Sequence, residues 1–212
     1  MKNFFLLLLF TTLCNCKAQT PILPLNGGTE AHGDTYNAYY KDINNFLNQY
    51  EGTWQLTQGS IVLKLMFLKK LMVYRNEIGT PYYTDYIVGE YQYIDVVEKI
   101  NTLNNLLINH SSLLDYGLSG NIALPNNLHP QCAECTTGEK RLVVDIYEPV
   151  IKEVSGLEGE MVFRKFTENG VDKLKVWFYK SHSGYGYTEN DVPTSITKHT
   201  IPYGVYILTK VP

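Results

Sequence analysis

NFLNQYEGTWQLTQGSIVLKLMF, residues 45–67, is the stretch that decides the fold class. Residues 52–58 and 60–68 read as two short strands, and Gln58-Gly59 reads as the turn between them. In the first strand Trp54 and Leu56 share one face, and in the second strand every other residue from Ile61 is apolar. The stretch therefore predicts the beginning of a β-rich domain.

The segment before this stretch has helical spacing. Apolar or aromatic residues recur at positions 36, 39, 40, 43, 46, 47 and 50. Gly52 follows, and a glycine at this place is typical of a helix end. The pattern predicts a short N-terminal helix over residues 36–50.

Strand patterns continue to the end of the chain. Asn169-Gly170, between two apolar runs, is the strongest hairpin signal. Gly89 interrupts a tyrosine-rich run and indicates a bulge or sharp bend. Segment 98–110 is expected to be a strand followed by a loop. Further strands are predicted at 82–97, 118–124, 140–147, 157–167, 171–180 and 203–211. The predicted fold is mainly β, an antiparallel barrel or half-open barrel of about eight or nine strands.

The N-terminus has the pattern of an export signal. Lys2 precedes an unbroken apolar run, residues 4–10, that is too short to span a bilayer. Cleavage after Ala18 is one interpretation. The alternative is cleavage after Asn15, because residues 13–16 resemble a bacterial lipoprotein box with Cys16 as the lipidated residue. We expect a signal peptide at 1–18, a flexible tether at 19–35 and one β domain at 36–212. The protein is predicted to be lipid-anchored in the bacterial cell envelope, in the periplasm or at the outer membrane. The alternative is that it is secreted.

The tripeptide Gly52-Thr53-Trp54 resembles the Gly-x-Trp motif that opens the first barrel strand of lipocalins and related calycins. The chain is also similar to exported bacterial proteins with a lipocalin-like domain of unknown function, many of them lipoproteins. The matching stretches are residues 16–19, 50–54, 88–93 and 206–210. The resemblance implies a barrel with the indole of Trp54 at its closed end and implies no activity.

The cysteines suggest a disulfide. An exported chain lies in a compartment that permits disulfides, so Cys132 and Cys135 are expected to bond to each other. The alternative is a zinc site that uses His129, Cys132 and Cys135.

The composition limits the function classes. The net charge of −3 argues against nucleic-acid binding, which needs a basic surface. No motif indicates catalysis or a cofactor. The five histidines are expected at the surface, and Asp85, Glu90 and Asp95 are expected to face solvent from strands.

The 17 tyrosines suggest binding surfaces as well as strand packing. Together with Trp54, a subset could form an aromatic rim around a barrel mouth, namely Tyr82, Tyr86, Tyr91, Tyr93, Tyr185 and Tyr187. The leading hypothesis is a non-enzymatic, lipid-anchored protein that binds a small apolar or amphipathic ligand inside the barrel. The alternative is an envelope interaction or structural protein with a filled interior and an exposed aromatic sheet face.

Overall fold

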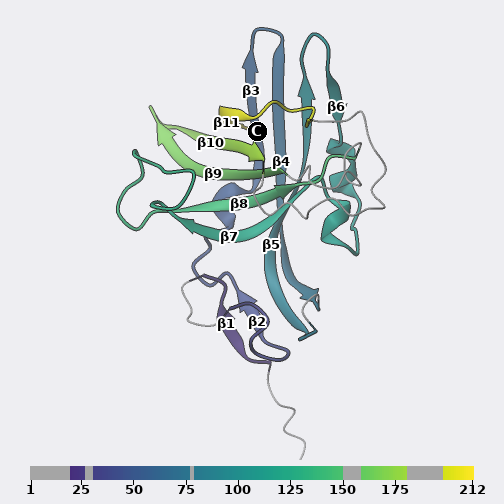
Figure 1. The fold of residues 1–212 in the computed structure, drawn as a ribbon, viewed down its shortest axis with the longest axis vertical. Helices are drawn as coiled ribbons and strands as arrows, with labels where there is room; N and C mark the ends of the chain where they lie inside the picture. The colour runs from purple at the N-terminus through teal and green to yellow at the C-terminus, as the bar shows by residue number, and fades with distance from the viewer. Residues whose placement is uncertain (1–19, 27–30, 77–78, 150–158, 181–197) are drawn as a thin grey trace, which may run out of the picture.

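The computed structural model is mainly β and is built around a closed barrel (Figure 1). It describes residues 20–26, 31–76, 79–149, 159–180 and 198–212. Eight antiparallel strands follow one another around the barrel in the order β5-β4-β3-β11-β10-β9-β8-β7, and three short strands lie outside it. The strands are β1 (Ile22–Pro24), β2 (Tyr39–Lys41), β3 (Gly52–Gln58), β4 (Ile61–Arg75), β5 (Tyr82–Ile94), β6 (Lys99–Asn101), β7 (Leu118–Pro125), β8 (Lys140–Ile146), β9 (Gly159–Glu168), β10 (Val171–Lys180) and β11 (Gly204–Val211).

The barrel closes because β5 pairs with two neighbours. It runs antiparallel to β4 from end to end, and its residues 87–89 also pair with residues 118–120 of β7. The predicted antiparallel barrel is therefore confirmed, and the half-open alternative is wrong.

The barrel interior is filled by apolar side chains. The strand register places Trp54 beside Leu65, and Leu65 beside Tyr91, so these residues share the inner face of β3, β4 and β5. All three side chains have an exposed fraction of 0%. The same cluster takes buried residues from all eight barrel strands, including Phe67, Leu118, Leu142, Val144, Met161, Phe163, Leu174, Val176 and Leu208.

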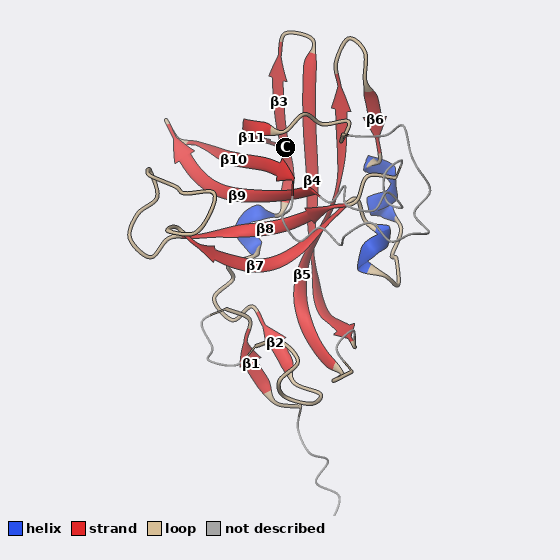
Figure 2. Ribbon diagram, viewed as in Figure 1, coloured by secondary structure: helices blue, strands red, loops and turns tan. Residues whose placement is uncertain are grey.

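The predicted helix over residues 36–50 is wrong. This segment contains β2 and a single 3-10 turn, η1 (Asn48–Tyr50), and the helical elements of the described chain are three 3-10 turns (Figure 2). The side chain of Asp42 accepts hydrogen bonds from the backbone N–H groups of Phe46 and Leu47, and such local bonds compete with helix formation. Asn45, at a φ of 54°, also interrupts helical geometry. The apolar spacing is met instead by packing Leu47 and Tyr50 into the core.

Two predicted turns have different outcomes. The Asn169-Gly170 hairpin is confirmed, since β9 and β10 pair up to Glu168 and Val171. The predicted bulge at Gly89 is wrong, because the register of β4 and β5 shifts between Lys70 and Val73 instead. Gly89 allows a close approach, and a Cβ there would lie 2.5 Å from Cδ1 of Phe67.

Part of the predicted tether 19–35 is ordered against the barrel. Ile22–Pro24 forms β1, which pairs in parallel with β2, and Leu25 is buried. The prediction of a flexible tether is therefore wrong for these residues. The predicted signal peptide, residues 1–18, lies outside the described residues. Within the described part of the chain, no helix is long and apolar enough to cross a membrane.

Candidate functional site

Trp54 is a core residue of the barrel. Its Nε1 donates a hydrogen bond to the backbone oxygen of Tyr50 at 2.8 Å. Tyr50 ends η1, so this 3-10 turn takes the place that the sequence had suggested for a helix next to Trp54. Because the indole is fully buried and its N–H is paired, Trp54 supports the barrel and does not face solvent.

The tyrosines predicted to form an aromatic rim lie in two places. Tyr82, Tyr91 and Tyr93 belong to the barrel core. Tyr86 packs in a separate cluster with Val88, and the guanidinium carbon of Arg75 lies 5.2 Å from the centre of its ring. Tyr185 and Tyr187 lie outside the described residues. The structure therefore divides the described tyrosines between the interior and the outer wall.

Cys132 and Cys135 form a disulfide, as predicted, with an S–S distance of 2.04 Å. Both sulfurs are thereby engaged, so the alternative zinc set with His129 is not assembled. The His129 ring lies 5.4 Å from the ring of Tyr179. The disulfide packs on the outer wall against Trp177, which makes this loop part of the barrel's covering.

A groove of about 610 Å³ lies where two 3-10 turns cover the outer face of β5. The turns are η2 (Leu103–Leu107) and η3 (Leu113–Asp115), and Leu106 and Leu113 pack against Val88 of β5. We call this feature the Glu90 groove. It is lined by Glu90, Asn101, Thr102, Asn104, Asn105, Ile108, His110, Leu114, Asp115, Tyr116, Gly117, Tyr147 and Pro149. Its volume is in the range of small-molecule sites.

Glu90 is fully buried at the base of this groove, with an exposed fraction of 0%. Its Oε1 accepts hydrogen bonds from Asn105 Nδ2 at 2.5 Å and from the backbone N–H of Gly117 at 3.0 Å. Its Oε2 is buried and has no hydrogen-bond partner among the described residues. A buried carboxylate oxygen without a partner is costly, because it has lost its water. Glu90 therefore has capacity to accept one more hydrogen bond.

Asn105 connects Glu90 to His110. The Nε2 atom of His110 lies 2.9 Å from Asn105 Oδ1 and 3.3 Å from the Asn105 backbone oxygen. Both partners are acceptors, so Nε2 carries the proton and a neutral His110 keeps Nδ1 as an acceptor. Asn105 Nδ2 also donates to the backbone oxygen of Asp115, which fixes the amide in place. The groove is thus built around an ordered polar base with apolar sides.

A second buried polar group lies at the end of β8. Glu148 is 1% exposed and accepts bonds from the backbone N–H and the hydroxyl of Thr200. His199, 2% exposed, places Nδ1 3.5 Å from Glu148 Oε2. Burial alone would raise the pKa of Glu148, but the neighbouring His199 ring and the hydrogen bonds from Thr200 outweigh it and lower the pKa. The expectation that all histidines lie at the surface is wrong for His199.

A third polar cluster joins β4 and β5 to β2 and the residue that follows it, Asp42. Asp85 accepts bonds from the Tyr39 hydroxyl at 2.6 Å, from the Met72 N–H and from the Asp42 N–H. Lys69 pairs with Asp42 at 2.8 Å. These groups satisfy one another, so we interpret the cluster as structural.

A second groove, of about 710 Å³, lies beside η1 and β9. Most of its charged side chains are paired: Asp42 with Lys69, Arg164 with Glu139, and Lys165 with Asp172. Its buried unpaired atom is the neutral amide Nδ2 of Asn26. An unpaired amide costs less than an unpaired carboxylate, so the Glu90 groove is the stronger candidate.

The sequence did not identify this groove. Glu90 and Asp85 were expected to face solvent, and that expectation is wrong, since both are buried. The covering residues Asn105 and Gly117 follow Glu90 by 15 and 27 positions. The available signal was Glu90 itself, one of two carboxylates inside a strand rich in apolar and aromatic residues.

The chain belongs to a family of unknown function, DUF6705, which matches residues 1–211. No curated protein matches the chain. No solved structure matches it either.

Proposed function

We propose that this protein is an exported, lipid-anchored, non-enzymatic binding protein that takes a small amphipathic ligand in the Glu90 groove. The observation that carries the proposal is the buried Oε2 of Glu90, which lacks a partner among the described residues and lies at the base of a groove of about 610 Å³. A hydrogen-bond donor on the ligand would complete the coordination of this carboxylate.

The ligand site is moved here from the barrel interior, where the sequence had suggested it. The described interior is occupied by large side chains such as Trp54, Phe67, Tyr91 and Phe163, all fully buried. An eight-stranded barrel is just wide enough for side chains to fill it. The barrel interior is filled by side chains, whereas the groove on the outer wall has room for a ligand.

The groove also favours one kind of ligand. Glu90 and Asp115 are acidic, and the described lining residues include no lysine or arginine. Ile108, Leu114 and Pro149 add apolar surface. These residues favour a ligand with an ammonium or other donor group at one end and an apolar body at the other.

The test compares two probes of similar size and opposite charge, 2-phenylethylamine and 3-phenylpropanoate. We expect the amine to bind and to shift the amide NMR signals of Asn105 and Gly117, and the carboxylate to bind at least tenfold more weakly. Glu90→Gln keeps the shape of the side chain and removes the charge, so amine affinity should fall about tenfold. Glu168→Gln, on the exposed β9–β10 hairpin, is the matched control. Equal binding of both probes, or an unchanged affinity in Glu90→Gln, would contradict the proposed site.

Export and lipid anchoring are separate parts of the proposal. Their support is the charged and apolar N-terminal pattern and the position of Cys16 after it. We expect the protein to be recovered from the membrane fraction with an added diacylglyceryl and acyl mass on Cys16, and Cys16→Ser to lack that added mass. An intact mass that begins at Gln19 would show cleavage after Ala18 and would refute the anchor.

The second candidate function is interaction through an exposed aromatic sheet face. It is favoured by a row of exposed and half-buried residues across β1, β2, β5 and β4.

A further inference from the structure

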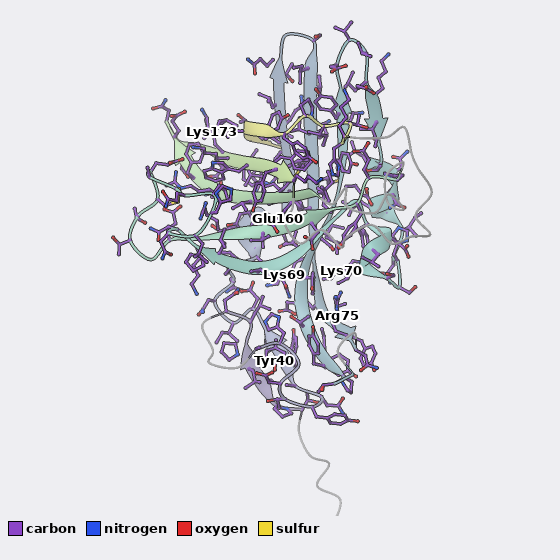
Figure 3. The ribbon with its side chains drawn as sticks, viewed as in Figure 1. Tyr40, Lys69, Lys70, Arg75, Glu160 and Lys173 are labelled. Atoms are coloured by element: carbon purple, nitrogen blue, oxygen red, sulfur yellow. A yellow bond between two sulfur atoms is a disulfide. The ribbon has the colours of Figure 1, made fainter. Side chains whose placement is uncertain are left out.

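One end of the molecule carries an apolar surface outside the barrel. β1, β2 and the adjoining ends of β4 and β5 lie together at the bottom of Figure 1, and the described chain begins there. In Figure 3, Tyr40 and Arg75 are labelled at this end. We call it the N-terminal pole.

The strand register aligns four residues across this pole. Ile22 pairs with Tyr39, Tyr39 with Tyr83, and Tyr83 with Tyr74. Residues directly opposite each other on paired strands point to the same face of the sheet. The rings of Tyr74 and Tyr83 are 5.6 Å apart and meet edge to face. The four side chains therefore form one continuous row across four strands.

The bulge in β4 extends this row. Leu71 and Met72 lie in the bulge, and their exposed fractions are 66% and 47%. The N–H of Met72 and the hydroxyl of Tyr39 both donate to Asp85, which holds the bulge next to the row. Ile22 and Tyr74 are each 55% exposed. We call these six residues the N-terminal apolar patch: Ile22, Tyr39, Leu71, Met72, Tyr74 and Tyr83.

We infer that the N-terminal apolar patch rests on a lipid surface and inserts its aliphatic and tyrosine side chains into the headgroup region. Tyrosine is enriched at membrane–water interfaces because its ring is apolar and its hydroxyl is polar. Leucine and methionine next to it supply side chains that gain free energy on leaving water.

The length of chain before β1 favours a membrane over a protein partner. This step rests on the proposed acylation of Cys16. Ile22 follows Cys16 by six residues, which span about 20 Å when fully extended. An acylated Cys16 would therefore keep β1, and the patch beside it, within about 20 Å of the bilayer at all times.

Charge contributes little to this contact. Lys69 is paired with Asp42, Lys70 Nζ donates to Asn109 Oδ1 at 2.7 Å, and the Arg75 guanidinium lies over the Tyr86 ring. These three cations are committed within the protein, and the exposed Lys41 of β2 adds a single positive charge at this end. We therefore expect docking to depend on apolar insertion and to be nearly independent of salt and of anionic lipid.

The test uses the exported chain with Cys16→Ser, which cannot be acylated, so its result does not depend on the anchor. Vesicles of phosphatidylcholine are added, with and without phosphatidylglycerol, and bound protein is measured by sedimentation. We expect binding to both vesicle types at similar strength. Leu71→Ser combined with Met72→Asn should reduce partitioning at least tenfold. Asparagine suits position 72 because Met72 has a φ of 54°.

The matched control lies at the opposite end of the molecule. The turn between β5 and β6 lies at the top of Figure 1. It contains Val96 and Val97, which are 81% and 82% exposed. Val96→Ser combined with Val97→Ser should leave vesicle binding unchanged. Tyr74→Trp should show a blue shift in fluorescence when vesicles are added, and Val97→Trp should not.

Three results would overturn the inference. They are absence of vesicle binding by the folded Cys16→Ser protein, equal losses in the Leu71 and Val96 variants, and dimerisation in sedimentation velocity that Leu71→Ser abolishes. The last result would show that a second copy of the chain covers the patch. Loss of acylation in the intact-mass experiment, with vesicle binding retained, would refute the anchor and leave the docking surface standing.

Discussion

The two faces of β5 are both buried, but they are buried by different means. On the inner face, Tyr91 and Tyr93 pack into the barrel core with Trp54 and Leu65. On the outer face, Val88 and Glu90 are covered by η2, η3 and the residues around them. The inner face is dry and apolar, whereas the outer face includes a carboxylate and a groove. The comparison supports a division in which the barrel provides stability and the covering holds the proposed ligand site.

The largest expected effect lies on the inner face. Trp54→Ala removes a fully buried indole and leaves a cavity in the core, which should lower the free energy of unfolding by about 3–5 kcal/mol. Trp54→Phe fills most of the space but loses the hydrogen bond to Tyr50, so it should cost less. Urea denaturation measures both variants. A loss below about 1 kcal/mol for Trp54→Ala would show that the interior is not the stabilising region.

The covering should respond to a smaller change. A Cβ at Gly117 would lie 2.7 Å from Glu90 Oε2 and 3.0 Å from Tyr91 Cε1. Gly117→Ala should therefore destabilise the fold by about 1–3 kcal/mol through overpacking and weaken the binding of 2-phenylethylamine in the groove.

Gly204→Ala is the control for this prediction, since a Cβ there meets nothing within 4 Å. Its effect on unfolding should be within about 0.5 kcal/mol. If Gly117→Ala were equally neutral, the outer covering would have to be loose enough to move away, and the two faces of β5 would differ in rigidity as well as in chemistry.

The sequence predicted the barrel wall better than its covering. The alternation of residues 140–147 and the Asn169-Gly170 turn are local signals, and both gave the observed strands. The burial of Glu90 depends on Asn105 and Gly117, which approach it only after the chain has folded back. The helix over residues 36–50 failed for a related reason, because side-chain bonds from Asp42 satisfy the backbone in place of helical bonds. Periodicity indicates which face is apolar, but it does not indicate what will cover the other face.

The smallest expected effect lies where the apolar interior ends, at Glu148. Its carboxylate lies next to His199 and accepts a hydrogen bond from Thr200. Burial is the main cause of the raised pKa of Tyr91, and the charge on Glu148 is the second. The pKa of Glu148 is lowered in the folded state. Its contribution to stability is therefore present above its unfolded pKa, near 4.5, and is lost as the pH falls through the lower folded value.

Glu148→Gln should reduce the free energy of unfolding by about 1 kcal/mol at pH 7, and the difference from the natural protein should shrink toward pH 3. Denaturation curves at the two pH values measure this, with Glu168→Gln as an exposed control. A difference that stayed constant or grew on acidification would show that the folded protein does not stabilise the charged form of Glu148. This residue would then belong with the apolar interior and not with the polar covering.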